Sequence, residues 1–294
     1  MLLNVSGKPG EAQGAWVQSS FKLDQPFFIR LAKSGQIDNK PGAGGNLGAA
    51  EAARAPADGY TLLMASPPLT ISPALYANLP YKPEQIAPVA LLGRVPNVLV
   101  VNPSSGLNSL ADLTAAARAR PGQLNYASNG QGTSLHLSAE LYKSQAGVFV
   151  THIPYRGAAA GLTGLMAGEV QMMFDNLPSA LGLIQGGKLK PLAVTTPQRS
   201  SVLPNVPTME EAGLKGYQVF AWFGLAAPAG LNAAVQQRLE QALEKVAAQA
   251  EVKSAMLKAG AEPTWANSQS MAAFMQSDMA QWKKVAAFAK ITLE

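Results

Sequence analysis

From residue 60 onward the chain repeats one pattern: a short apolar run, a turn of Gly, Pro, Ser or Asn, and then an alanine-rich stretch with helical spacing. Apolar runs of strand length occupy residues 60–65, 89–92, 98–101, 124–127, 148–154, 171–174 and 192–195. Helical patterns occupy residues 110–117 and 135–145, a third ends near residue 167, and from residue 232 the pattern is helical, at 232–250, 252–259 and 268–290. Such alternation favours a parallel sheet with right-handed crossovers. We therefore predict an α/β fold.

Composition excludes several classes of protein. The chain has 294 residues, and no apolar stretch approaches the roughly 18 residues needed to span a bilayer. The absence of cysteine excludes disulfides, thiolate metal sites and a cysteine nucleophile. The net charge is +5, but the basic residues are scattered and are not interleaved with aromatic residues. We therefore expect neither an integral membrane protein nor a nucleic-acid binder.

The first 35 residues follow a different pattern. They are polar, rich in Gly, Ser and Gln, and weakly patterned. Residues 1–7 show no basic segment followed by an apolar stretch, so no signal peptide is visible in this sequence. Two interpretations stay open: a cytoplasmic protein, or a mature or recombinant form of an exported one.

The loops that follow the predicted strands are the candidate ligand sites, because parallel α/β sheets bind ligands beyond the carboxyl ends of their strands. The strongest candidate is residues 128–134. Its glycines allow close backbone approach, its hydroxyls can donate hydrogen bonds, and a helix N-terminus follows, which together suit a carboxylate. The alternative is an ordinary capped turn. The residues singled out are Ser128, Asn129, Gly132, Thr133 and Ser134.

Two further loops have similar chemistry. One offers a phenol, a guanidinium and small residues, in Tyr155, Arg156, Gly157, Ala158 and Ala159. The other offers an acceptor and an amide, in Asp175 and Asn176. The alternatives are a solvated arginine and an Asx turn ahead of Pro178.

Other sequence patterns are weaker evidence for a functional site. Residues 42–48 resemble a dinucleotide-binding glycine motif, but no clear strand precedes them and no acidic residue ends a strand about 20 residues later. Residues 182–188 lack the Ser or Thr that a phosphate loop needs next, and fit a helix end at Gly186. His136 and His152 share no motif, and we expect structural roles for both. We predict no catalytic residue, metal or cofactor, although a site assembled in space would leave an enzyme as an alternative.

A series of motifs, in order, resembles the Bug family of solute receptors, the extracytoplasmic binding components of tripartite tricarboxylate transporters. The motifs are DNKPGAGGNLG at 38–48, ADGYTLL at 57–63, PALY at 73–76, PGQLNYAS at 121–128, GTSLHL at 132–137, PYRG at 154–157, FDNLPSA at 174–180, LPNVPT at 203–208 and WFGL at 222–225. The likeness runs from about residue 36 to the C-terminus.

The resemblance implies a two-lobed periplasmic binding protein fold of the second type, a clamshell with a central ligand cleft. Residues 1–100 and 227–294 would form lobe one, and residues 101–226 lobe two, with crossings at 98–102 and 220–227. The three loops above, together with Ser66, Pro67 and Pro68, would line the cleft, and residues 38–48 would form a structural turn. The chain would be a periplasmic monomer, not an enzyme, that binds a small organic acid and delivers it to membrane permease subunits.

One departure from the family affects the N-terminus. Family members begin with a strand, a Pro-Gly-Gly loop and an aspartate that form part of the pocket, and residues 1–35 contain no such arrangement. Residues 28–32 are interpreted as a remnant of the helix that follows that loop. Three alternatives remain: a receptor that signals to a membrane histidine kinase, a small-molecule enzyme, and a family member whose binding is impaired.

Overall fold

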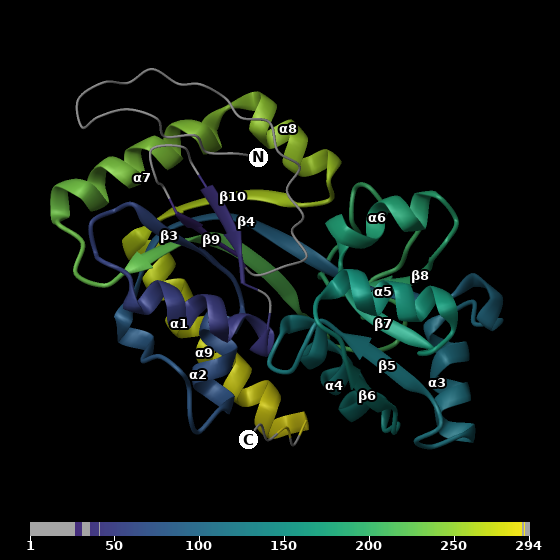
Figure 1. The fold of residues 1–294 in the computed structure, drawn as a ribbon. Coiled ribbons are helices and arrows are strands. Elements are labelled where there is room, and N and C mark those ends of the chain that lie inside the picture. The colour runs from purple at the N-terminus through teal and green to yellow at the C-terminus, as the bar shows by residue number, and fades with distance from the viewer. Residues whose placement is uncertain (1–26, 31–35, 41, 290, 292–294) are drawn as a thin grey trace.

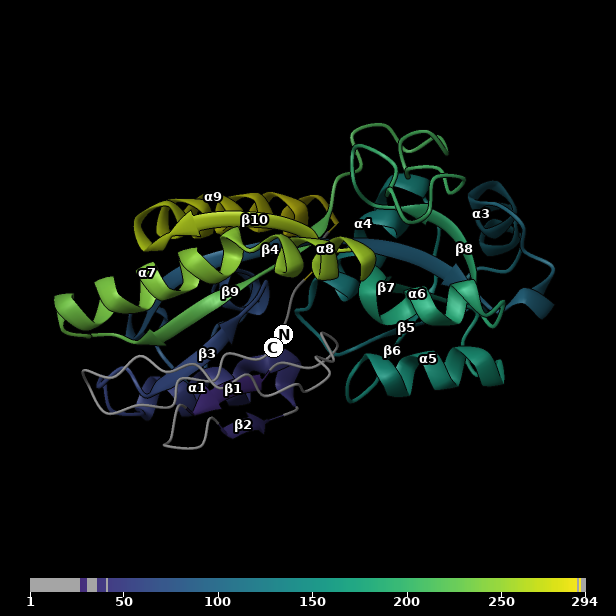
Figure 2. The ribbon, with the colours of Figure 1, turned by 90° about the horizontal axis from the view of Figure 1, so that it is seen from above.

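One strand, β4 (Ile86–Val101), runs through both halves of the molecule (Figures 1 and 2). Up to Pro96 it pairs with β9 (Phe220–Pro228), and from Asn97 it pairs with β7 (Met172–Asn176) and β8 (Lys190–Val194). The computed structural model describes residues 27–30, 36–40, 42–289 and 291. We call the part built on residues 86–96 the terminal half and the part built on residues 97–101 the middle half.

Each half has its own strands and covering helices. The terminal half contains β1 (Phe27–Arg30), β2 (Gln36–Asn39), the short 3-10 helix η1 (Ala43–Gly45), α1 (Asn46–Arg54), β3 (Thr61–Ala65), α2 (Pro68–Leu75), η2 (Pro83–Gln85), β9, α7 (Ala233–Ala248), α8 (Ala250–Lys258), β10 (Glu262–Asn267) and α9 (Ser268–Ala289). The middle half contains η3 (Pro103–Ser105), α3 (Leu110–Ala119), β5 (Asn125–Ser128), α4 (Ser134–Ala146), β6 (Thr151–Pro154), α5 (Ala158–Ala167), β7, α6 (Leu177–Gln185) and β8.

The middle half is a sheet covered on both faces, as its sequence alternation requires. Leu99 and Phe174 point to one face and pack with residues of α3 and α4, such as Leu113 and Leu137. Their neighbours Val98, Val100 and Met173 point to the opposite face and pack with residues of α5 and α6. The two buried layers fix the strands, and therefore fix where the loops after the strands emerge.

Local sequence signals locate several element ends correctly. Ser109 caps α3, and its hydroxyl accepts a hydrogen bond from the Asp112 N–H at 3.1 Å. Gly186 is the C-cap of α6, as the glycine pattern predicts. The predicted strand at 60–65 corresponds to β3, and the predicted helix at 135–145 to α4. In each case one short segment contains the whole signal.

Three sequence-based predictions are wrong. The sheet is mixed, since β5 pairs in parallel with β6 and β7 while β4 pairs antiparallel with β7, β8, β9 and β10. The runs at 89–92 and 98–101 belong to one strand, because the residues between them also pair with β9. By contrast, the helices predicted at 232–250, 252–259 and 268–290 are confirmed as α7, α8 and α9, and β10, an edge strand of β4, occupies the gap before the last of them. The third wrong prediction is the helix remnant at 28–32, since residues 28–30 lie in β1 between β2 and β3; residues 31 and 32 lie outside the described residues.

The rest of the N-terminal departure concerns residues 1–26 and 31–35, which lie outside the described residues. No helix within the described part of the chain is long and apolar enough to cross a membrane.

Candidate functional site

Three helices of the middle half begin at the same edge of its sheet. The parallel strands β5, β6 and β7 are neighbours, with Ser128 opposite Pro154 and Tyr126 opposite Met172. Each strand leads into a helix of nine residues or more, namely α4, α5 and α6. Helix N-termini carry unpaired N–H groups and a partial positive charge. This edge therefore concentrates main-chain hydrogen-bond donors.

The loop at residues 128–134 is held by its own hydroxyls. The Ser128 hydroxyl donates to the Gly130 carbonyl and accepts from the Gly130 N–H, each at 3.1 Å. The Thr133 hydroxyl donates to the Gly130 carbonyl at 2.9 Å and caps α4 by accepting from the His136 N–H at 3.3 Å. Both hydroxyls were predicted ligand contacts, and the structure uses them to shape the loop. The donors left at this turn are main-chain groups.

The other predicted residues of this loop surround the same turn. Gly132 has a positive φ of 71°, which favours glycine, and it is buried. Ser134 opens α4 and is 5% exposed. Asn129 is half-buried, and its Oδ1 is buried without a hydrogen-bond partner. An acceptor without a partner is the arrangement that a donor from a ligand or a water would complete.

Two stacked histidines contact the loop at residues 128–134. The rings of His136 and His152 lie 4.4 Å apart at 21°, and His152 also stacks on Tyr126 at 4.7 Å. His152 Nε2 and Ser128 Oγ are 2.7 Å apart. Burial, followed by the nearby Lys143, lowers the pKa of His136 to about 4. Burial, followed by His136 itself, lowers the pKa of His152 to about 3. Both rings are therefore neutral at pH 7, as fits the structural roles that the sequence predicts.

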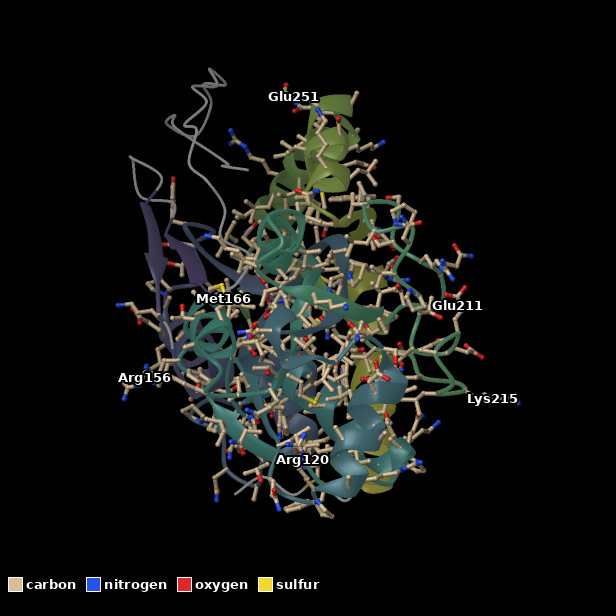
Figure 3. All side chains as sticks on the ribbon, turned by 90° about the vertical axis from the view of Figure 1, so that its right-hand side faces the viewer. Arg120, Arg156, Met166, Glu211, Lys215 and Glu251 are labelled. Atoms are coloured by element: carbon tan, nitrogen blue, oxygen red, sulfur yellow. The ribbon has the colours of Figure 1, made fainter. Side chains whose placement is uncertain are left out.

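The loop after β6 directs its larger side chains elsewhere. The Tyr155 phenol donates to Glu169 Oε2 at 2.9 Å, and partial burial and that carboxylate raise the pKa of Tyr155. Arg156 is exposed, and Figure 3 shows its side chain pointing outward from the molecule. The structure does not bring either group to residues 128–134. At the sheet edge this loop contributes main-chain groups. Gly157 has a φ of 98° and precedes the buried Ala158 and the exposed Ala159.

The loop after β7 adds buried polar groups. Asp175 is fully buried and accepts a hydrogen bond from the Ser179 hydroxyl. Asn176 is 5% exposed, pairs in register with Asn97 of β4, and precedes α6. The Oδ1 atoms of Asn97 and Asn176 are both buried without a hydrogen-bond partner.

Sequence reasoning missed Asn97 and its neighbours. The Asn97 amide donates to the Ser138 hydroxyl at 3.0 Å, and the Thr195 hydroxyl donates to the Asn97 carbonyl at 3.0 Å. These groups come from β4, α4 and the end of β8, so no local motif unites them. The available signal was a single amide, Asn97, inside the apolar run of residues 95–101.

The remaining predicted residues lie in the terminal half. Ser66, Pro67 and Pro68 lead from β3 into α2, and the carbonyls of Ser66 and Pro67 accept hydrogen bonds from the first turn of that helix. Proline has no N–H, so this segment offers few donors. Among the described residues there is no group of three or more His, Asp or Glu side chains placed to hold a metal ion.

Comparison with known proteins identifies the family. The family model for the tripartite tricarboxylate transporter family receptor matches residues 23–290. The structure of Rpa4515 from R. palustris with adipate is 37% identical, with a TM-score of 0.86 over 88% of this chain and 87% of that chain. Periplasmic binding protein BugD is 30% identical, with a TM-score of 0.83 over 87% of each chain. MatC from Rhodopseudomonas palustris with bound malate is 30% identical, with a TM-score of 0.77 over 83% of this chain and 85% of that chain. The chain therefore belongs to the tripartite tricarboxylate transporter receptor family, the TctC or Bug solute-binding proteins, and has their α/β periplasmic binding protein fold.

Proposed function

We propose that this receptor captures a small carboxylate between its two halves and delivers it to the membrane permease subunits of a tripartite transporter. Family membership makes the chain a solute receptor and not an enzyme. Two relatives bind adipate and malate, which are both carboxylates. The observation that carries the proposal is the sheet edge where α4, α5 and α6 all begin.

In this proposal the carboxylate is bound by main-chain donors. One oxygen meets the N–H groups of Thr133 and Ser134 at the start of α4, and the other meets those of Ala158 and Ala159 at the start of α5. The N–H groups of Gly132 and Gly157 already donate to His136 Nδ1 and to the Tyr155 carbonyl, so they shape the two turns. Oriented amides in a dry site bind an anion well because they need no reorganisation when it arrives. Asn129 and Asn176 accept hydrogen bonds from the rest of the ligand or from bridging water. Residues 66–68 form the facing wall, and the exposed Arg156 attracts anions from a distance.

Closure of two lobes completes the proposed site. The change of strand partners between Pro96 and Asn97, and the entry into β9 at Phe220, support hinges at these two points. They lie four and seven residues before the lobe boundaries predicted at 100/101 and 226/227. Closing excludes water and strengthens each polar contact. We place the receptor in the periplasm as a monomer.

A thermal-shift screen with mono-, di- and tricarboxylates, including adipate and malate, tests the function. A ligand present at about a thousand times its Kd stabilises the folded state by about 4 kcal/mol. We expect a clear shift with at least one acid and none with its neutral diamide. A cooperatively folded protein that shifts with no acid would overturn the proposal.

The placement of the site has its own test. We expect the double variant Thr133→Ala with Gly157→Val to lose the shift while still unfolding cooperatively. Unchanged affinity in this variant would place the site elsewhere.

A further inference from the structure

Besides the packing of the end of α9 on α4, through Trp282 and a hydrogen bond from Ser144 to the Phe288 carbonyl, the two halves meet at a close contact between a glycine and the opposite main chain. Gly44 lies in η1 of the terminal half, and residues 130–131 lie between β5 and α4 of the middle half. A Cβ added at Gly44 would stand 2.4 Å from the Gln131 carbonyl oxygen, and a Cβ added at Gly130 would stand 3.4 Å from the Gly44 Cα and N atoms. A contact at 2.4 Å is too close for any real Cβ atom. The approach of the two main chains therefore requires that residue 44 has no side chain.

The segment that carries Gly44 has an unusual backbone. Residues 42–45, which we call the glycine turn, have φ values of 133°, 47°, 61° and 105°. Ala43 is the one residue other than glycine with a positive φ in the described part of the chain. The turn is closed by a hydrogen bond from the Gly45 N–H to the Gly42 carbonyl at 3.0 Å. Three glycines in four residues make this shape accessible.

The glycine turn is fixed to the terminal half. It leads directly into α1, whose residues Ala49, Ala50 and Ala52 are buried in the core of that half with Leu63 and Trp222. A side chain at residue 44 therefore cannot be accommodated by moving the turn alone. Because the atom it would meet is a backbone oxygen, rotation of a neighbouring side chain cannot relieve the overlap either.

The segment that it touches is the loop proposed to hold the carboxylate. A Cβ at Gly44 would also lie 3.5 Å from Cγ2 of Thr133, the residue that caps α4. The terminal half thus meets residues 128–134 next to the proposed anion-binding N–H groups.

We propose that the glycine turn is the closing surface of the receptor, and that Gly44 controls ligand affinity without touching the ligand. This inference rests on the proposed function. A side chain at residue 44 holds the halves apart, so the binding-competent closed state is less populated. The apparent Kd rises in inverse proportion to that population. The glycine motif at 42–45 then acts in closure and not in dinucleotide binding.

A second glycine contact between the halves shows what makes Gly44 special. A Cβ at Gly260 of the terminal half would stand 3.0 Å from Leu177 Cγ and 3.3 Å from Val202 Cγ2 in the middle half. These neighbours are side-chain atoms that can shift by a few tenths of an ångström. The Gly260 contact therefore tolerates alanine better than the Gly44 contact does.

The test compares Gly44→Ala with the matched control Gly147→Ala. Gly147 has a φ of 62°, against 61° for Gly44, and a Cβ there meets nothing within 4 Å. Both variants suffer the same backbone strain, so only the contact between the halves distinguishes them. We expect Gly44→Ala to weaken binding of adipate or malate, whichever shifts the wild type, by about tenfold or more. We expect Gly147→Ala to bind as the wild type does.

Distances between spin labels report closure directly. The chain has no cysteine, so labels at Arg54→Cys and Ala160→Cys are unique. Both positions are exposed, on α1 and α5, which lie on the same side of the molecule and in different halves (Figure 2). In the labelled protein that keeps Gly44, we expect a population with a short distance between the labels, and we expect the ligand to increase it. We expect Gly44→Ala to remove this population.

The outcomes separate the two proposals. If no acid shifts the wild type, the proposed function fails, and the unliganded distances still decide the closure proposal. A short-distance population that is absent from the wild type, or that persists in Gly44→Ala, overturns the role of the glycine turn. Equal ligand affinity of Gly44→Ala and wild type overturns it as well.

Discussion

The loops after β5 and β6 lie side by side at one edge of the sheet and use their side chains in opposite ways. In residues 128–134 the hydroxyls of Ser128 and Thr133 fold back onto the loop and fix its shape. In residues 155–159 the Tyr155 phenol bonds to Glu169 and Arg156 points outward. Both arrangements leave main-chain N–H groups as the donors at the edge. We infer that carboxylate recognition in the middle half depends on the placement of the main chain more than on the identity of the side chains.

Acid should affect the first loop most strongly, because stacked neutral histidines support it. Folded pKa values of about 4 for His136 and about 3 for His152 lie below the ordinary value of 6.5. Below pH 6.5 the unfolded chain binds protons that the folded protein does not bind. The free energy of unfolding is therefore highest above pH 6.5 and decreases as the pH falls from 6.5 toward 4 and 3. We expect a loss on the order of 2 kcal/mol per histidine at pH 5. Urea unfolding between pH 4.5 and 7.5 measures it.

The control for this prediction is the double variant His136→Phe with His152→Phe, which keeps two stacked rings. Its stability should change less with pH than that of the wild type. Since Glu140 and Lys143 face the same rings and remain in both proteins, the difference isolates the histidines. Parallel pH profiles would show that the stack does not titrate in this range.

Ligand binding by the loop at residues 155–159 should be lost when a side chain at residue 157 displaces its main chain. Gly157→Val places a branched side chain at a φ of 98°, directly before α5. We expect carboxylate affinity to fall by about 100-fold, equivalent to about 3 kcal/mol, because the N–H groups of residues 158 and 159 move. Isothermal titration measures it.

Gly168→Val is the matched control, since Gly168 caps the other end of α5 with a φ of 82° and a Cβ there meets nothing within 4 Å. This control should keep its affinity. Equal losses in both variants would indicate general damage to α5.

Removing the cap of α4 should have a smaller effect. Thr133→Ala deletes a hydroxyl with two hydrogen bonds and is expected to cost about 1 kcal/mol of stability. Ligand affinity should fall several-fold as the loop loosens. Thr133→Ser keeps the hydroxyl and should restore both quantities in the same thermal and titration measurements. Failure of the serine variant to restore affinity would mean that the threonine methyl group is what matters.

The smallest effect is expected at Arg156. Because its side chain is exposed and directed outward, Arg156→Ala should change affinity by about twofold, and this difference should vanish at high salt. Titrations at low and high ionic strength measure it. A tenfold loss that persists at high salt would show that Arg156 turns inward and contacts the ligand, which would end the contrast between the two loops.

Features encoded in short segments could be predicted from the sequence. The Ser109 cap, the helix end at Gly186 and the loops after β5, β6 and β7 each follow from a few adjacent residues. The resemblance of ordered motifs identified the family correctly. Signals of this kind do not depend on where the rest of the chain lies.

Features that join distant segments could not be predicted. Strand β4 contains Pro88, Gly93 and Pro96, which locally indicate turns, and pairing with β9 and β10 keeps it extended. The direction of the Tyr155 side chain depends on Glu169 of a later turn, and the amide of Asn97 meets Ser138 of α4. The contact of Gly44 with Gln131 likewise exists only once the two halves meet.

Amide chemical shifts of ¹⁵N-labelled protein, recorded while adipate or malate is added, show which N–H groups bind the carboxylate. The main-chain N–H groups at the starts of α4 and α5 are proposed to bind the carboxylate. We predict that the largest shifts, downfield in the proton dimension, fall on residues 133–134 and 158–159, and that a neutral diamide leaves these amides unchanged. Saturable binding whose shifts spare both segments would contradict this prediction.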